Sequence, residues 1–104
     1  MKARIVLPAF LLLLTAAIHA PDHVIKQAGK KFSATDLTVA AGETIQYVND
    51  DAVTHNVFSV TPSHRFNLGV MKPGDQGEIA FEDAGTLEVR CAIHPAMVMN
   101  VTVE

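Results

Sequence analysis

Turn-forming residues recur at short intervals along most of this chain, and this spacing constrains its fold more than any other feature. The segments between them are short and rich in Val, Ile, Phe, Leu and Thr, which is typical of β-strands. No window of twelve or more residues keeps a helical period. The pattern therefore predicts an all-β sandwich or barrel. The turns are expected at Ala41-Gly42, Asn49-Asp50-Asp51, Thr61-Pro62-Ser63, Lys72-Pro73-Gly74-Asp75 and Asp83-Ala84-Gly85.

Alternation of apolar and polar residues predicts which side chains face the interior, because successive residues of a strand point to opposite faces of a sheet. The two C-terminal segments alternate most clearly. We expect Cys91 to point inward at the end of its strand. The complete inward set is Leu87, Val89 and Cys91 in 86–91, Met97, Met99, Val101 and Val103 in 97–104, and Leu37, Val39, Ile45, Tyr47, Ile79 and Phe81 earlier in the chain.

The stretch HNVFSV, residues 55–60, does not fit one alternation. Phe58 and Val60 have the same parity as Asn56, whereas His55 has the opposite parity. A β-bulge would resolve this conflict, because one extra residue in a strand shifts the alternation. A ligand that enters from the end of the strand would also resolve it.

The first twenty residues have the layout of a secretory signal peptide. Two basic residues precede an apolar run from Ile5 to Leu14, and small residues follow. The run is much shorter than the roughly 20 residues that span a bilayer. We expect cleavage after Ala20 or Ala17, a periplasmic location without membrane insertion of the mature form, and a single domain over residues 21–104.

The charge balance argues against nucleic acid and anionic membrane surfaces as partners. From Pro21 onward the chain has six Lys or Arg against eleven Asp or Glu, a net charge of −5, and it has no basic run. Nucleic acids and anionic surfaces are bound mainly through clustered positive charge. Neither is therefore expected as a partner.

The only cysteine lies in CAIHPAM, residues 91–97, together with a histidine and a methionine. Small exported domains usually contain paired cysteines, so a lone thiol is expected to be buried, joined to another chain or bound to a ligand. Thiolate and thioether suit Cu(I), and imidazole suits Cu(II) as well. A structural zinc site would need four Cys or His ligands. The segment therefore favours copper, which would also stabilise a small domain that has no disulfide.

A copper site with two imidazoles, one thiolate and a distant methionine needs a second histidine besides His94. The other histidines are His19, His23, His55 and His64. His55 is the best placed, because it lies where a turn gives way to an apolar strand and its ring can project from the strand's end. His19 can be lost with the signal peptide, His23 is near a terminus, and His64 lies in a polar loop.

These segments resemble the cupredoxins, the small blue copper proteins, and most closely the amicyanin-like and plastocyanin-like members. The resemblance rests on THNVF, on CAIHPAM with its Cys-x2-His-x2-Met spacing, on FSATDLTVAAGETIQYVND and on the C-terminal VTVE. It covers nearly the whole predicted mature chain. It implies a cupredoxin-like Greek-key β-sandwich or barrel that binds one type 1 copper ion.

By this resemblance, the equatorial copper ligands are His55, Cys91 and His94. The axial ligand is Met97, although Met99 would satisfy the longer spacing of plastocyanin-like loops. Met97 is preferred because the chain from there to Glu104 matches the amicyanin ending without a gap. The resemblance also implies that Asn56 braces the copper-bearing loop, since groups around the ligands fix ligand orientation.

The resemblance implies a one-electron carrier that is not an enzyme. In this fold the ring of His94 would lie at the surface within an apolar rim formed by Ala92, Ile93, Pro95 and Ala96. Such a rim suits brief contacts with redox protein partners. We expect a monomer.

Copper homeostasis is the second function that the sequence leaves open, through sequestration of copper or oxidation of Cu(I). Side chains that could supply additional copper donors are His23, His64, Met71 and Met99. Cleavage after Ala20 would also make His23 the third residue, an arrangement that chelates Cu(II). A thiol enzyme with Cys91 as nucleophile and His94 as base is disfavoured, because the cysteine points inward and no cleft or orienting acid is evident.

Overall fold

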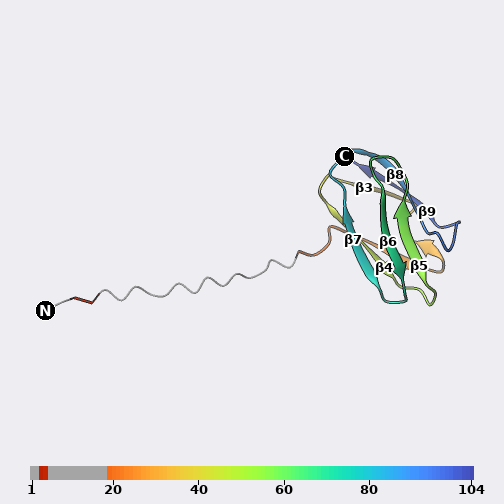
Figure 1. Ribbon diagram of the computed structural model, residues 1–104, viewed down its shortest axis with the longest axis horizontal. Helices are drawn as coiled ribbons and strands as arrows, with labels where there is room; N and C mark the ends of the chain where they lie inside the picture. The colour runs from red at the N-terminus through yellow and green to blue at the C-terminus, as the bar shows by residue number, and fades with distance from the viewer. Residues whose placement is uncertain (1–2, 5–18) are drawn as a thin grey trace.

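Nine β-strands make up the secondary structure of the described residues, 3–4 and 19–104, in this computed structural model (Figure 1). None of these residues is helical, and none belongs to a helix that could cross a membrane. Most of the predicted signal peptide, residues 1–2 and 5–18, lies outside the described residues. The strands are β1 (His23–Ala28), β2 (Lys31–Phe32), β3 (Asp36–Val39), β4 (Thr44–Asn49), β5 (His55–Ser59), β6 (Phe66–Met71), β7 (Gln76–Ala80), β8 (Gly85–Arg90) and β9 (Val98–Val103).

The strands form two mixed sheets, and their inner faces enclose the core. The first sheet has the order β2-β1-β4-β7, and the second has the order β3-β9-β8-β5-β6. The pairs β1–β4 and β3–β9 are parallel, whereas the other pairs are antiparallel. The predicted all-β sandwich is therefore confirmed.

The five predicted turns separate consecutive strands from β3 to β8. Of the residues in these turns, only Asn49 and Gly85 also belong to strands: Asn49 is the last residue of β4 and Gly85 is the first of β8. Gly42 and Gly74 have φ angles of 84° and 88°, a left-handed conformation that favours glycine because it has no Cβ. The turn residues thus set where each strand of this region begins and ends.

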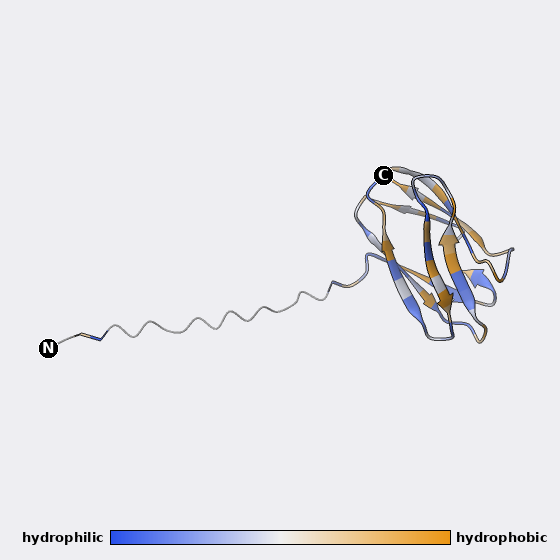
Figure 2. Cartoon of the chain, in the orientation of Figure 1, coloured by the Kyte–Doolittle hydropathy of each residue, from blue (hydrophilic) through white to orange (hydrophobic). Residues whose placement is uncertain are grey.

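Most of the core consists of side chains that alternation predicts to face inward. The core residues that it did not predict are Ile25, Phe32, Val57 and Met71. Ile45, Tyr47, Val89, Met99 and Val101 are completely buried, and burying such a side chain contributes about 1.5–3 kcal/mol of hydrophobic free energy. Figure 2 shows the resulting alternation of apolar and polar positions along the strands. Leu37 and Ile79 are only partly buried and pack against the edge of this cluster.

A β-bulge accompanies HNVFSV, but its extra residue lies on β6. The pairing of β5 with β6 shifts register between Asn56 and Phe58, where β5 advances by two residues and β6 by three. The alternation of β5 itself is regular, since His55 and Val57 are buried whereas Val60 is exposed. The extra residue expected within HNVFSV is therefore not found there. Asn56 is buried as well, so a histidine and an asparagine lie inside the same end of β5.

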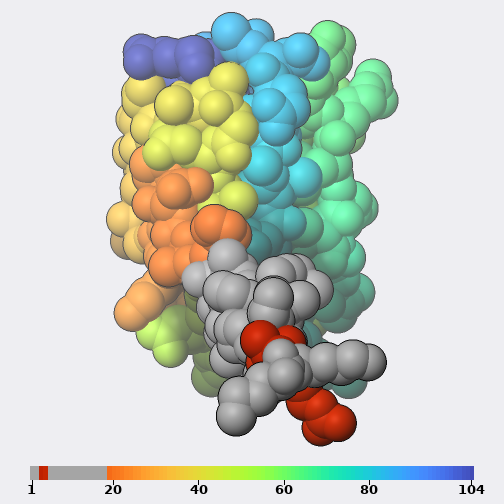
Figure 3. All heavy atoms as spheres, turned by 90° about the vertical axis from the view of Figure 1, so that its left-hand side faces the viewer, coloured from red at the N-terminus to blue at the C-terminus, as the bar shows by residue number. Residues whose placement is uncertain are grey.

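The C-terminus is fixed to the turn between β3 and β4. Glu104 N donates a hydrogen bond to Val39 O, and Ala41 N donates one to Glu104 O. Figure 3 shows these C-terminal residues, in dark blue, beside the yellow atoms of that turn. This contact anchors β9, and β9 leads directly out of the loop that carries the soft donors.

Candidate metal centre

The start of β5 and the loop between β8 and β9 bring the predicted donors together. His55 is the first residue of β5, while Cys91 and His94 lie in the loop that joins β8 to β9. The loop is closed by hydrogen bonds from Cys91 N to Met97 O (3.3 Å) and from Met97 N to His94 O (2.9 Å). Cys91 was predicted to end its strand but lies one residue after β8, and Met97 was predicted to begin the next strand but lies one residue before β9.

The donor atoms of His55, Cys91 and His94 lie within 4.8 Å of one another. Cys91 Sγ is 3.9 Å from Nδ1 of His55 and 3.8 Å from Nδ1 of His94, and the two Nδ1 atoms are 3.1 Å apart. Zinc, as a reference cation, binds imidazole nitrogen and thiolate sulfur at about 2.0–2.3 Å, so two ligands of one such ion lie about 3–4 Å apart. The three donors therefore fit a single first-row metal ion.

Asp51 holds the ring of His55 in the orientation that exposes Nδ1 to the other donors. Its carboxylate lies 2.9 Å from His55 Nε2, and because a carboxylate only accepts, Nε2 carries the proton. The Nδ1 lone pair then faces Cys91 and His94, as a metal ligand requires. A hydrogen bond from Lys30 N and the contact with His55 lower the pKa of Asp51 to about 2.

Nothing in the sequence marked Asp51 as part of this site. The signal available for it was its position four residues before His55 within the predicted turn.

Cys91 is buried, with 2% of its surface exposed. The backbone N–H of Asn56 donates to its Sγ at 3.3 Å. A hydrogen bond to a cysteine sulfur is one of the features that tune a copper–thiolate centre. The first two residues of β5 therefore supply an imidazole close to the thiol and a hydrogen-bond donor to it.

The side chain of Asn56 joins three segments of the chain. Its Oδ1 accepts from Ala92 N at 3.3 Å, in the donor-bearing loop. Its Nδ2 donates to Asn67 Oδ1 and to Gly69 O, both at 2.9 Å. Asn56 is therefore well placed for the bracing role that the sequence predicts, and Asn67 is a partner that the sequence did not reveal.

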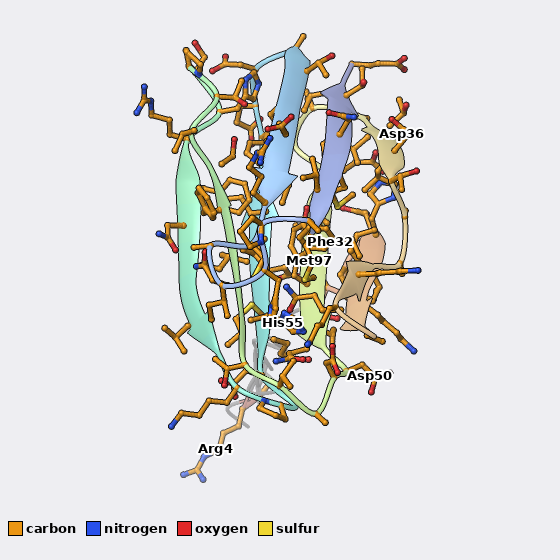
Figure 4. The ribbon with its side chains drawn as sticks, turned by 90° about the vertical axis from the view of Figure 1, so that its right-hand side faces the viewer. Arg4, Phe32, Asp36, Asp50, His55 and Met97 are labelled. Atoms are coloured by element: carbon orange, nitrogen blue, oxygen red, sulfur yellow. The ribbon has the colours of Figure 1, made fainter. Side chains whose placement is uncertain are left out.

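Met97 and Met99 occupy different surroundings. Met97 is buried in the loop and lies beside Phe32 (Figure 4), and both line a cavity of about 310 Å³. Met99 lies deeper in the core, where the Tyr47 hydroxyl donates to its Sδ at 3.6 Å. Burial raises the pKa of Tyr47, so the hydroxyl keeps the proton that it donates.

The other predicted donors lie in separate environments. His23 Nε2 is 3.2 Å from a Glu43 carboxylate oxygen, and His64 Nε2 donates to Asp83 O at 2.8 Å. Met71 is buried on β6 as the register partner of His55. Among the His, Cys, Asp and Glu side chains of the described residues, only His55, Cys91 and His94 form a cluster that could hold a metal ion.

The loop presents an apolar surface around the partly buried His94. Ile93 is exposed to 48%. Ala92, Pro95 and Ala96 are also exposed. This agrees with the predicted rim.

Comparison with protein families matches residues 22–104 to the copper-binding proteins of the plastocyanin/azurin family. The chain belongs to this family. As a cupredoxin it has copper as its cofactor, and two imidazoles with one thiolate are the donors that a type 1 site requires. The cupredoxin fold expected from the sequence is therefore confirmed.

Individual cupredoxins are similar to this chain in sequence and structure. Amicyanin of Paracoccus denitrificans is 31% identical over 78% of the chain. A Cu(I) form of an amicyanin mutant superposes with a TM-score of 0.77 and 29% identity, covering 86% of this chain and 88% of that one. A purple cupredoxin from Nitrosopumilus maritimus gives a TM-score of 0.71 and 29% identity, covering 80% and 100%. The chain spans 64% of the length of the Paracoccus denitrificans protein.

Proposed function

We propose that this cupredoxin is a periplasmic one-electron carrier whose copper ion is held by His55, Cys91, His94 and Met97. The observation that carries the proposal is the convergence of two Nδ1 atoms and one Sγ within 4.8 Å at one end of the sandwich. Bound copper would supply one-electron exchange between Cu(I) and Cu(II). The four residues would provide the ligand set of a type 1 centre, with Met97 as the distant thioether.

The protein supports this role by holding the donors in place. His55 is fixed by Asp51, and Cys91 is fixed by the backbone of Asn56. Ligands held rigidly by surrounding hydrogen bonds need little rearrangement when the charge of the centre changes. A carrier benefits from this rigidity, because each electron transfer then requires little movement of the protein.

The surface around His94 suits a redox protein as partner. His94 is only partly buried, and the exposed apolar residues Ile93 and Pro95 flank it in the loop. Small, weakly held interfaces are typical of electron-transfer encounters. We expect a monomer that meets its partners briefly at this surface.

Copper homeostasis is the alternative function, and it requires more than one copper ion per chain. The additional donors expected for it are His23, His64, Met71 and Met99. Three of them have partners within the protein, namely Glu43 for His23, Asp83 for His64 and Tyr47 for Met99. A thiol enzyme is also disfavoured, because a Cys91 with 2% exposure is hard for a substrate to reach.

A copper titration followed by visible absorption tests the proposal. We expect an intense thiolate-to-copper band that saturates at one copper per chain, followed by rapid reduction and reoxidation by a small redox protein. Continued binding after the band saturates, together with slow exchange of electrons, would favour copper homeostasis. The absence of the band would reject the type 1 site.

A further inference from the structure

We propose that Asn67 is a positioning residue of the metal centre, acting on Cys91 through the side-chain amide of Asn56. This inference rests on the proposed copper-binding function. Asn67 belongs to β6 and Cys91 follows β8, so β5 lies between the two segments in the sheet. The amide of Asn56, on β5, is the physical connection between them.

The orientation of the Asn56 amide depends on its neighbours. Its NH₂ group faces two acceptors, Asn67 Oδ1 and Gly69 O. A rotation of the amide by half a turn would place its oxygen against those two oxygens and would leave the Ala92 N–H facing a donor. The two acceptors on β6 therefore direct the Asn56 carbonyl toward Ala92.

Asn67 is itself held with its oxygen toward Asn56. Gly69 N donates to Asn67 Oδ1 at 2.7 Å, which fixes that oxygen as the acceptor. Gly69 has a φ angle of 76°, a conformation that glycine adopts without steric cost. One local turn therefore presents both acceptors, the Asn67 oxygen and the Gly69 carbonyl, to the same NH₂ group.

The orientation of the Asn56 amide in turn affects Cys91, the residue that carries the thiol. Asn56 contacts two adjacent residues of the loop. Its backbone N–H donates to Cys91 Sγ, and its side-chain oxygen Oδ1 accepts from Ala92 N. If Asn67 is lost, the Asn56 amide gains freedom to rotate, and the hydrogen bond that it accepts from Ala92 N is weakened. The direction of the Cys91 side chain then becomes less well defined.

Asn67 is exposed, so its replacement removes the hydrogen bonds from Asn56 Nδ2 and Gly69 N without opening the core. The test compares Asn67→Ala with Asn67→Asp, which keeps an acceptor oxygen at the same position. Asn100→Ala on β9, also an exposed asparagine, is the matched control. Two readouts are needed: hydrogen exchange of the Ala92 amide in the metal-free protein, and the resonance Raman pattern of the copper–sulfur bond in the loaded protein.

We expect Asn67→Ala to accelerate exchange of the Ala92 amide by about fivefold or more, as the loss of one net hydrogen bond would, and to alter the copper–sulfur pattern. Asn67→Asp and Asn100→Ala should each keep the exchange rate of the Ala92 amide and the copper–sulfur pattern of the unmodified protein. The proposal is overturned if Asn67→Ala matches Asn100→Ala, or if Asn67→Asp behaves like Asn67→Ala. The exchange readout needs no copper, so a failure of copper binding would be seen separately from a failure of this inference.

Discussion

The backbone N–H of Asn56 donates a hydrogen bond to Cys91 Sγ across 3.3 Å, although 35 positions separate the two residues in the chain. His55 and Asn56, the first two residues of β5, are both buried, and they lie beside a bulge whose extra residue is on β6. A donor aimed at a thiolate stabilises the negative charge on its sulfur. One strand end therefore supplies a candidate ligand and a group that tunes another.

Cys91→Ser is expected to abolish the intense visible band and to weaken copper binding. The hydroxyl that replaces the thiol is a hard donor, and the charge-transfer band depends on the thiolate. The variant should fold, because serine is similar in size to cysteine. Absorption spectra and copper stoichiometry measured beside the unmodified protein check this, and a retained band would reject Cys91 as a ligand.

Met97→Gln is expected to shift the reduction potential, because the axial ligand is one determinant of the potential of a type 1 centre. Met99→Leu should leave the potential unchanged, since Met99 Sδ accepts from Tyr47. The second change conserves volume but leaves the buried Tyr47 hydroxyl without its acceptor, so we expect it to lower the free energy of unfolding by about 1–3 kcal/mol. Cyclic voltammetry of both variants distinguishes the two methionines. The reverse pattern would identify Met99 as the axial ligand.

Asp51→Asn is expected to weaken copper binding by about 10- to 100-fold, the usual effect of removing the partner of a metal-bound histidine. An amide can donate to His55 Nε2 and so favour the tautomer with its proton on Nδ1, the atom that faces Cys91 and His94. Competition with a chelator of known affinity measures the change. Asp50→Asn is the control, because it alters charge at the neighbouring position. Equal affinities for the two variants would contradict this role of Asp51.

Local sequence patterns predict much of this fold because turn residues and alternation act over short distances. They place the inward faces of β8 and β9, whereas the extra residue that they suggested within HNVFSV lies instead on β6. The N-terminal strand was not predicted, because Gln27 is buried in β1 where alternation would favour an apolar residue. Its place in the first sheet comes from parallel pairing with β4, which no local pattern encodes.

The candidate site was predictable where spacing carries the information and not where distant segments meet. CAIHPAM places Cys91 and His94 three residues apart, so their proximity follows from one short loop. The contact between Asn56 and Asn67 depends instead on how β5 and β6 pair. No feature of the sequence near Asn67 distinguishes it from an ordinary exposed asparagine. Its role became visible only from the hydrogen bonds.

The stability of the metal-free protein is expected to fall in acid partly through Asp22. The backbone N–H of Thr44 donates to its carboxylate at 2.8 Å and lowers the pKa of Asp22 below its ordinary value of 3.8. A lowered folded-state pKa stabilises the protein above the unfolded-state pKa, and this contribution is lost as the pH falls through the folded-state value.

Urea unfolding of Asp22→Asn and the unmodified protein at pH 7 and near pH 3 tests this linkage. The variant should be the less stable of the two at pH 7, and the difference should narrow in acid as Asp22 becomes protonated. Asp50→Asn, which makes the same change at another exposed aspartate, is the matched control. A constant difference for Asp22→Asn would contradict the linkage.

Gln27→Met is expected to stabilise the protein. Gln27 is completely buried, and its Oε1 and Nε2 have no hydrogen-bond partner among the described residues. An unsatisfied buried polar group costs about 1–3 kcal/mol, and methionine fills a similar volume without polar donors or acceptors. Urea unfolding of the metal-free protein should therefore show a gain of this order. A loss of stability would contradict this expectation, and it is the result that a buried water bound to the amide would give.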